Sequence, residues 1–274
     1  MANETPYVLG TGNDELQRLG LQHRLWADAA HAAFRRAGIR IGQRVLDVGS
    51  GPGFASFDLA QLVTRQGAVV AVDESGAFLD HVESQARSRD LPQLRVRRGN
   101  VEQLPDVLAG EPPFDLAYAR WVLCFVRDPA AVVRGVAAAV RPGGRFVVHD
   151  YFNYASMTLA PRRASHDRVV AATVAAWRRN GGDPDVVGRL PAMLDASGFT
   201  VLQIDVHQRV ARGCDSMFGW VDTWWHTFAP KLVTMGLLTA EHADELLRDL
   251  QSMRGDPHSF VQCPPVYEVL AERR

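Results

Sequence analysis

The segment Val45–Gly53 combines glycines and an acidic side chain at a spacing that suits ligand binding. An apolar run is followed by three glycines, each two positions from the next, and Asp47 stands two positions before the first of them. Glycine has no Cβ, so the backbone can turn sharply and approach a ligand closely. The segment predicts a strand-to-helix turn that binds a nucleotide-like ligand.

The residues around this turn discriminate between nucleotide-like ligands. A dinucleotide fingerprint starting at Gly49 would require Gly or Ala at position 54, where this chain has Phe54. A phosphate-binding P-loop would require a lysine after the turn, and Lys231 is the only lysine of the chain. The carboxylate of Asp47 would repel a phosphate and attract a cation. The turn therefore favours a cationic ligand over NAD, FAD or a nucleotide phosphate.

The spacing of Asp47, Gly49, Gly51 and Gly53 resembles the first motif of the class I S-adenosylmethionine-dependent methyltransferases, in which an acidic residue precedes Gly-x-Gly-x-Gly. The cofactor of that family carries an ammonium and a sulfonium, which agrees with a cationic ligand. The resemblance covers about residues 43 to 151 and includes the further segments Gly99–Glu102, Phe114–Leu123 and Val140–Gly144.

The resemblance implies roles for residues at the ends of the expected strands. Asp73, twenty residues after Gly53, would accept hydrogen bonds from both ribose hydroxyls, although a helix N-cap is an alternative interpretation. Asn100 stands where the family often has Asp, and its carbonyl would accept from the adenine amino group. The leader resembles that of a small-molecule subgroup and adds Tyr7 and Gln22 at the methionine end. The cofactor-binding set predicted in this way is Tyr7, Gln22, Asp47, Gly49, Ser50, Gly51, Gly53, Asp73, Glu74, Asn100, Val101, Glu102, Arg120 and Trp121.

Three residues are candidate catalytic bases: His149, Asp150 and His226. The first two end the fifth expected strand beside the expected acceptor pocket, and each could remove a proton from a substrate hydroxyl. Strand alternation turns one of that pair away, so His149 could instead be a core residue. His226 belongs to the aromatic segment Trp220–Phe228, which either holds a flat apolar acceptor or only attaches this part of the chain to the sheet. Methyl transfer itself requires no metal.

Short β-branched runs alternate with longer helical patterns, which predicts βαβ units around a parallel sheet. The expected strands are Arg44–Val48, Ala68–Asp73, Leu94–Arg98, Phe114–Ala119, Gly144–Asp150, Phe199–His207 and Val266–Glu272. The expected helices are Asn13–Leu25, Trp26–Ala37, Phe54–Gln66, Ser75–Arg89, Pro129–Val140, Arg162–Arg179, Asp185–Ser197, Asp215–Phe228 and Ala240–Met253. The fold class is therefore α/β, with a doubly wound, seven-stranded, mostly parallel sheet, as in the Rossmann-like methyltransferases.

The expected elements divide the chain into three parts. Residues 1–42 form an N-terminal helical cap. Residues 43–207 and 265–274 form the Rossmann-like cofactor-binding core. Residues 208–264 form a helical lid insertion that contributes to the substrate pocket. Because the insertion separates two terminal strands, we expect it to be built onto the sheet.

Composition limits the classes of partner. The net charge is −1 and the arginines are scattered, which disfavours nucleic acid. No apolar run is long enough for a membrane helix and no signal peptide is recognisable, so we expect a cytoplasmic protein. Cys124, Cys214 and Cys263 are too far apart for a Cys-x-x-Cys metal site. We expect no metal, a small-molecule acceptor and no membrane partner, and we leave open a homodimer.

These observations predict an S-adenosylmethionine-dependent methyltransferase that yields S-adenosylhomocysteine. The expected acceptor is a small aromatic or hydrophobic molecule resembling a natural product, with oxygen favoured because the insertion is aromatic and candidate bases are near. Methylation of carbon or nitrogen is an alternative, as is a protein of the same fold that binds the cofactor without transferring methyl groups. A nicotinamide-dependent oxidoreductase is disfavoured by Phe54 and Asp47.

Overall fold

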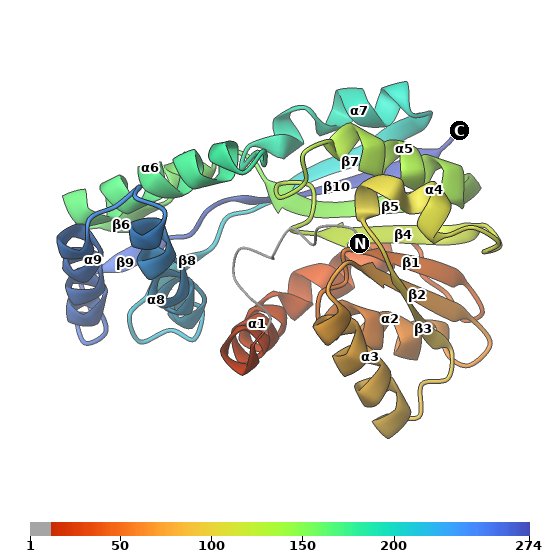
Figure 1. Cartoon of the computed structure of the whole chain (residues 1–274), viewed down its shortest axis with the longest axis horizontal. Helices are drawn as coiled ribbons and strands as arrows, with labels where there is room; N and C mark the ends of the chain where they lie inside the picture. Colours follow the sequence, from red (N-terminus) through yellow and green to blue (C-terminus); the bar gives the residue numbers. More distant parts are fainter. Residues whose placement is uncertain (1–11) are drawn as a thin grey trace.

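A seven-stranded sheet forms the centre of the computed structural model, which describes residues 12–274 (Figure 1). Its strands are β1 (Arg44–Val48), β2 (Ala68–Asp73), β3 (Leu94–Arg98), β4 (Phe114–Arg120), β5 (Val140–Tyr151), β7 (Phe199–His207) and β10 (Val266–Arg273). They lie in the order β3-β2-β1-β4-β5-β10-β7. The strands from β3 to β5 are parallel, whereas β10 is antiparallel to both of its neighbours. The predicted fold class is confirmed.

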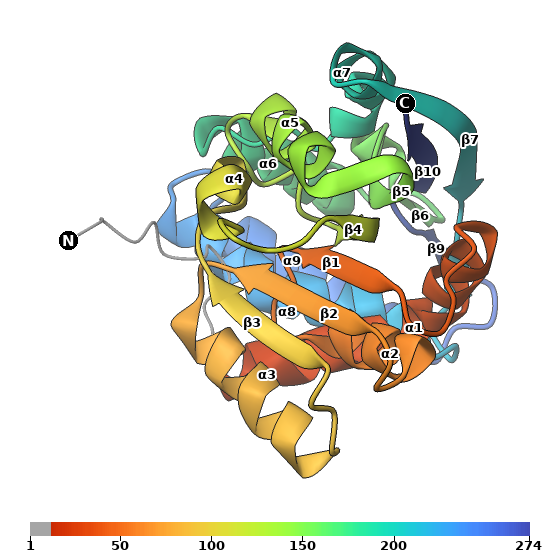
Figure 2. The ribbon, with the colours of Figure 1, turned by 90° about the vertical axis from the view of Figure 1, so that its right-hand side faces the viewer.

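Helices cover both faces of this sheet (Figure 2). One face carries α1 (Asn13–Arg36), α2 (Phe54–Val63) and α3 (Gly76–Ser88). The other face carries α4 (Leu104–Val107), α5 (Pro129–Ala139) and α7 (Leu190–Ala196), together with the short 3-10 turns η1 (Val101–Gln103) and η3 (Val186–Gly188). The strand order reverses between β1 and β4, and such a reversal opens a crevice at the carboxyl ends of the strands.

The expected strands β1, β2, β3 and β7 begin and end at the predicted residues. Strand β5 begins at Val140, four residues earlier than predicted, because Val140 already pairs with Phe114 of β4. The pairing is then interrupted, with Gly143 at a left-handed φ of +72°, and resumes at Arg145. The core strands are buried on both faces, as the side chains of Val45, Leu46 and Val48 show, and such strands read as continuous apolar runs.

The leader forms one continuous helix, α1, where the sequence analysis expected two consecutive helices. Neither Leu25 nor Trp26, where the first predicted helix ends and the second begins, is a glycine or proline that would break a helix. The helical hydrogen bonds therefore continue across this junction. Its second half buries Trp26, Ala33 and Phe34 against the sheet. The helix ends before Gly38, which has the left-handed φ of +70° that terminates helices.

A second group of elements lies at one end of the molecule (Figure 1). It contains α6 (Ala164–Arg179), α8 (Phe218–Thr234) and α9 (Ala240–Met253), with the turn η2 (Tyr154–Ser156) next to α6. A three-stranded sheet joins β6 (Thr158–Ala160), β9 (Phe260–Gln262) and β8 (Val210–Arg212). The sequence analysis did not predict this sheet, because strands of three residues are too short to show alternation. It ties residues 158–160 to the predicted insertion 208–264.

Helix α8 is displaced from its predicted range Asp215–Phe228, and it continues through Pro230 to Thr234. It packs against the first half of α1. No helix in the described part of the chain is long and apolar enough to cross a membrane.

Candidate functional site

A cavity of about 1190 Å³ opens at the carboxyl ends of β1, β2, β3, β4 and β5. This is the position at which ligands bind in open α/β sheets. Twelve of the predicted cofactor-binding residues line it: Gln22, Asp47, Gly49, Ser50, Gly51, Asp73, Glu74, Asn100, Val101, Glu102, Arg120 and Trp121. Tyr7 lies outside the described residues, and its assignment stays a prediction.

Glycine is favoured at the three positions of the turn after β1 for different structural reasons. Gly49, Gly51 and Gly53 all have left-handed φ values, of +65°, +53° and +76°. A Cβ on Gly49 would lie 2.6 Å from Val122, and a Cβ on Gly53 would lie 2.5 Å from Val82, so both positions are closed by packing. A Cβ on Gly51 would meet no atom within 4 Å. Only Gly51 therefore leaves open space beside the cavity, whereas Gly53 shapes the turn and is not among the lining residues, so its cofactor contact stays a prediction.

Asp73 is held in place by backbone donors. Its Oδ2 accepts from the N–H of Gly51 at 2.8 Å, and its Oδ1 accepts from the N–H of Ser75 at 2.9 Å. Burial raises the pKa of this carboxyl, although these hydrogen bonds oppose the shift. Ser75 is the N-cap of α3, since its side chain accepts from the N–H of Phe78. Each carboxylate oxygen of Asp73 keeps a further lone pair for a ligand hydroxyl.

Asn100 begins the turn η1 after β3. Its side-chain carbonyl accepts from the N–H of Glu102 at 2.8 Å, which fixes its direction at the cavity edge. The Glu102 carboxylate in turn accepts from the N–H of Asp128. The carbonyl of Asn100 has a second lone pair, so the predicted contact to an amino group is compatible with this capping bond.

Asp47 and Arg120 place opposite charges at the centre of the cavity lining. Asp47 is buried and accepts from the Ser56 hydroxyl. Burial raises the pKa of Asp47 to about 6, and the Arg120 guanidinium partly opposes this shift. One Arg120 nitrogen, Nη2, lies 3.1 Å from His23 Nδ1. The other, Nη1, is buried and has no hydrogen-bond partner among the described residues. The pair therefore offers one anionic and one cationic group to a ligand.

Gln22 connects α1 with α8 at the cavity wall. Its side-chain oxygen accepts from Arg18 Nη1 at 3.2 Å and from the indole N–H of Trp220 at 2.9 Å. The buried Arg18 also makes two hydrogen bonds of 2.7 Å to Glu15, one helical turn away. A buried ion pair of this kind is costly unless its hydrogen bonds are satisfied, as they are here. The leader is thereby fixed over the carboxyl edge of the sheet.

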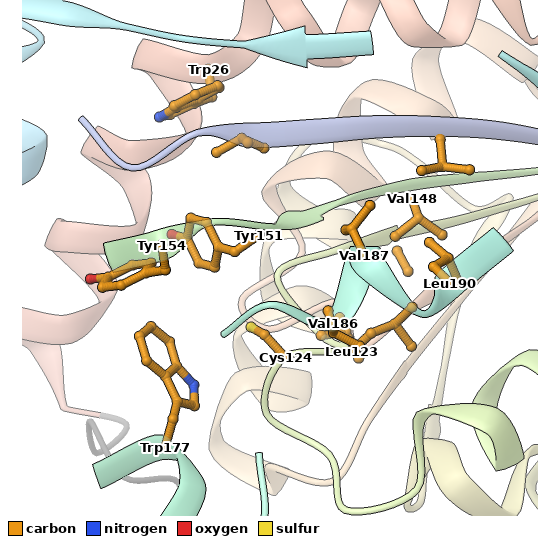
Figure 3. Close-up of a cluster of buried hydrophobic side chains, with 14 of the residues drawn as sticks. Trp26, Leu123, Cys124, Val148, Tyr151, Tyr154, Trp177, Val186, Val187 and Leu190 are labelled. Atoms are coloured by element: carbon orange, nitrogen blue, oxygen red, sulfur yellow. The ribbon is translucent and has the colours of Figure 1, made fainter. Parts of the chain in front are cut away.

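Aromatic side chains line the rest of the cavity. They come from β5, η2, α6 and α8, and they are Tyr151, Tyr154, Trp177, Trp220, Trp224 and Phe228. Figure 3 shows Tyr151, Tyr154 and Trp177 close together. Trp121 joins them from the end of β4, where it has a φ of +54°. A bulky residue in this conformation costs about 1–3 kcal/mol, and such strain is concentrated at functional sites.

The sequence analysis did not select Tyr151, Tyr154 or Trp177 as site residues. Tyr151 directly follows the predicted end of β5, and that position was the available signal, because carboxyl ends of strands meet at the crevice. Trp177 lies on α6, and its helical pattern does not reveal which face meets the cavity. Arg18 of the leader lines the cavity as well.

The structure contradicts the placement on which the predicted catalytic role of His149 rested. His149 is buried and does not line the cavity. Its ring lies 3.0 Å from the Tyr118 hydroxyl and 3.1 Å from Glu268, which also contacts His207 and makes two hydrogen bonds with Arg36. Burial lowers the pKa of His149, and although burial alone would raise the pKa of Glu268, its hydrogen bonds lower it. His149 is therefore a core residue, which was the alternative interpretation.

His149, His207 and Glu268 place three metal-binding atoms within 4.8 Å of one another. The guanidinium of Arg36 already pairs with both oxygens of Glu268. A cation in this position neutralises the carboxylate and would repel a metal ion. The donor set thus fits an internal ion-pair network better than a metal centre.

Asp150 and His226 do not belong to the cavity lining, and their roles as bases stay predictions. Both oxygens of Asp150 accept backbone hydrogen bonds, from Cys124 and Tyr151, and burial raises the pKa of Asp150 to about 6. Asp150 supports the backbone at the cavity edge. His226 is exposed on α8, where its Nδ1 bonds to the carbonyl of Asp222 one turn earlier. Its helical position turns it outward, whereas Trp224 and Phe228 turn inward.

Comparison with known proteins identifies the family of this chain. Residues 39–186 match the family described as a methyltransferase domain, and this match spans more than half of the chain. The chain belongs to this methyltransferase family. Within this family, the chain is of the class I, small-molecule type that its sequence resembles.

Individual relatives are more distant. The chain is 30% identical over 192 residues to an uncharacterized 37.1 kDa protein in transposon TN4556 of Streptomyces fradiae. The aligned segment covers 66% of this chain and 51% of that protein. It is 27% identical over 147 residues to the ubiquinone/menaquinone biosynthesis C-methyltransferase UbiE of Idiomarina loihiensis, covering 53% and 56%. The chain thus spans about half the length of these curated relatives. The crystal structure of YcgJ from Bacillus subtilis superposes with a TM-score of 0.59 at 16% identity, covering 90% of this chain and 99% of that chain, which supports the fold.

Proposed function

We propose that this protein transfers a methyl group from S-adenosylmethionine to a small, flat acceptor, and that the methylated atom is oxygen. The observation that carries the proposal is the division of one cavity into a polar part at the glycine turn and an aromatic part beside it. The family supports the cofactor. The net charge of −1 and the aromatic lining support a small apolar acceptor over a nucleic acid.

The polar part has groups that match the cofactor from end to end. The methionine end of S-adenosylmethionine is a zwitterion, and Asp47 with the unpartnered Nη1 of Arg120 offers a matching pair of charges. The open space beside Gly51 leaves room for the sugar, whose hydroxyls can reach the oriented carboxylate of Asp73. Asn100 and Val101 belong to the same lining and would contact the adenine.

S-adenosylmethionine supplies a methyl carbon that is activated by the positive sulfur. The described residues would contribute position and environment. The turn after β1 and the Asp73 carboxylate fix the cofactor, and the aromatic side chains hold the acceptor in line with the methyl carbon and exclude water. Alignment of two bound reactants can account for about 7–11 kcal/mol of a barrier. No step in this scheme needs His149, Asp150 or His226.

Carbon methylation is the second candidate, and the relative named as a C-methyltransferase is the reason for keeping it. The buried indole N–H groups of Trp121 and Trp177, which have no described partner, favour oxygen as the methylated atom. Carbon-13 NMR of the transferred methyl group distinguishes an ester or ether methyl, which is bonded to oxygen, from a methyl bonded to carbon.

The cofactor assignment is tested by Asp73→Ala. We expect this change to weaken S-adenosylhomocysteine binding by at least about tenfold, because two charge-assisted hydrogen bonds are lost. Isothermal titration calorimetry measures the effect. Asp80→Ala, on the exposed side of α3, is the matched control and should bind like the unmodified protein. Equal dissociation constants for both variants, with unchanged melting temperatures, would remove Asp73 from the cofactor site.

A further inference from the structure

The aromatic part of the cavity, here called the acceptor chamber, is enclosed by a continuous series of ring contacts. Tyr151 lies 5.1 Å from Tyr154, and Tyr154 lies 4.8 Å from Trp177, measured between ring centroids (Figure 3). Trp177 stacks on Trp224 at 6.1 Å, and Trp224 stacks on Phe228 at 4.8 Å. Walls of this kind bind a flat, apolar body.

The polar atoms of the chamber are mainly hydrogen-bond donors. The indole nitrogens of Trp121 and Trp177 are buried and have no hydrogen-bond partner among the described residues. Burial raises the pKa of the Tyr151 and Tyr154 hydroxyls well above the usual range, so both stay protonated and able to donate. A buried donor without a partner costs about 1–3 kcal/mol. A ligand oxygen that reaches one of these groups would accept its hydrogen bond and remove this cost.

The charged residues are unevenly distributed along the cavity. Its carboxylates belong to residues at or just after the carboxyl ends of β1, β2 and β3, in the cofactor part: Asp47, Asp73, Glu74 and Glu102. The charged side chains on the chamber side are arginines. Arg18 lies over the Trp224 ring at 5.5 Å and pairs with Glu15, while Arg127 and Arg179 are exposed at the rim. An anion therefore meets attraction at the entrance, and an ammonium meets repulsion.

The chamber also lacks a group that could take a proton from the acceptor. Within residues 12–274 the cavity lining contains no histidine, and no carboxylate faces it from α6, α8 or the end of β5. The three predicted bases lie elsewhere, as described above. A weakly acidic hydroxyl would therefore enter with its proton and find no acceptor for it.

On the basis of the proposed methyl transfer, we propose that the acceptor is a flat molecule with an acidic oxygen group, a carboxylate or an acidic phenol or enol, which enters the chamber already ionised. The proton is lost to bulk solvent before binding. The oxygen anion attacks the methyl carbon, the new C–O bond forms, and the C–S bond breaks with its electron pair remaining on sulfur. An anion and a sulfonium become two neutral products, and a chamber of low polarity favours such charge neutralisation over bulk water.

Naphthalene derivatives of one shape test this proposal: 2-naphthoate, heptafluoro-2-naphthol, 2-naphthol and 2-(aminomethyl)naphthalene. At pH 7 we expect kcat/KM for the two ionised oxygen acids to exceed that for 2-naphthol at least about tenfold, because only the ionised fraction reacts. The rate with 2-naphthol should rise with pH towards the pKa of the naphthol itself. If no probe is turned over, calorimetry on the S-adenosylhomocysteine complex decides, and naphthoate should bind at least about tenfold more tightly than the ammonium.

Equal rates and affinities across the series, preference for the ammonium, or no binding of any probe would overturn the proposal. Failure of the proposed function itself is separate, because it would show as absent binding of S-adenosylhomocysteine to the unmodified protein.

A pair of variants tests the donors. Trp177→Phe removes the indole N–H but keeps an aromatic ring, and we expect about fivefold weaker naphthoate binding with unchanged binding of naphthalene. Trp225→Phe is the matched control, because Trp225 also has a buried indole nitrogen without a described partner but does not line the cavity. Equal naphthoate affinities in the two variants would contradict recognition by the chamber donors.

Discussion

The two parts of the cavity are built from different portions of the chain and from different kinds of atoms. The cofactor part comes mainly from residues 47–122, and its contacts are backbone groups and carboxylates at the ends of adjacent parallel strands. The acceptor chamber combines aromatic side chains from Tyr151 to Phe228 with Arg18 of the leader. Local sequence thus specifies the part that binds a common cofactor, whereas long-range packing shapes the part that selects the acceptor. Changes in one part should leave binding in the other intact.

Gly51→Asn is expected to give the largest loss of cofactor binding without a loss of acceptor binding. Asparagine tolerates the left-handed conformation at this position, and its side chain would enter the open space beside the turn. We expect S-adenosylhomocysteine affinity to fall at least about a hundredfold, since the steric conflict with the ligand cannot relax into the protein. Calorimetry measures the loss.

Gly110→Asn is the matched control for this change. Gly110 also has a positive φ and no atom near its Cβ position, but it lies outside the cavity. Its cofactor affinity should stay within about twofold of the unmodified protein. Retained affinity in Gly51→Asn would mean that the cofactor lies elsewhere in the cavity.

A change in the acceptor chamber should weaken acceptor binding and leave cofactor binding unchanged. Trp224→Leu removes the ring that stacks on both Trp177 and Phe228. We expect naphthoate affinity to fall about tenfold, because aromatic stacking beyond buried area contributes about 0.5–1.5 kcal/mol per pair. The dissociation constant of S-adenosylhomocysteine should not change. A parallel loss of both affinities would show that the two parts are coupled.

The smallest effect concerns pH and Asp47. Burial raises the pKa of this carboxyl to about 6 in the ligand-free protein, and a cationic ligand requires the ionised form. Protonation therefore competes with binding around and below pH 6, and S-adenosylhomocysteine affinity should fall about twofold from pH 7 to pH 6 and about fivefold from pH 6 to pH 5. Calorimetry at several pH values measures this profile. Asp47→Asn should flatten it, and an unchanged profile in that variant would assign the titration to another group.

The sequence predicted most of the sheet because its central strands are continuous buried apolar runs between glycine turns. It also predicted twelve residues of the cavity lining, since the ends of neighbouring parallel strands must meet at one edge. The sequence did not predict where the side chains of the candidate bases lie. His149 and Asp150 stand on the correct strand, but alternation turns them to opposite faces and packing buries both, and helical rotation turns His226 to solvent.

The sequence by itself determined the α/β sheet, the glycine turn and the carboxylate at Asp73, because strand periodicity and backbone conformation are local properties. The tertiary structure decided which aromatic rings face the acceptor and where the ionisable groups lie. Those features depend on contacts such as Gln22 with Trp220 and His149 with Glu268, which join residues more than a hundred positions apart. Side-chain direction at such distances follows from packing between elements, and no local pattern records it.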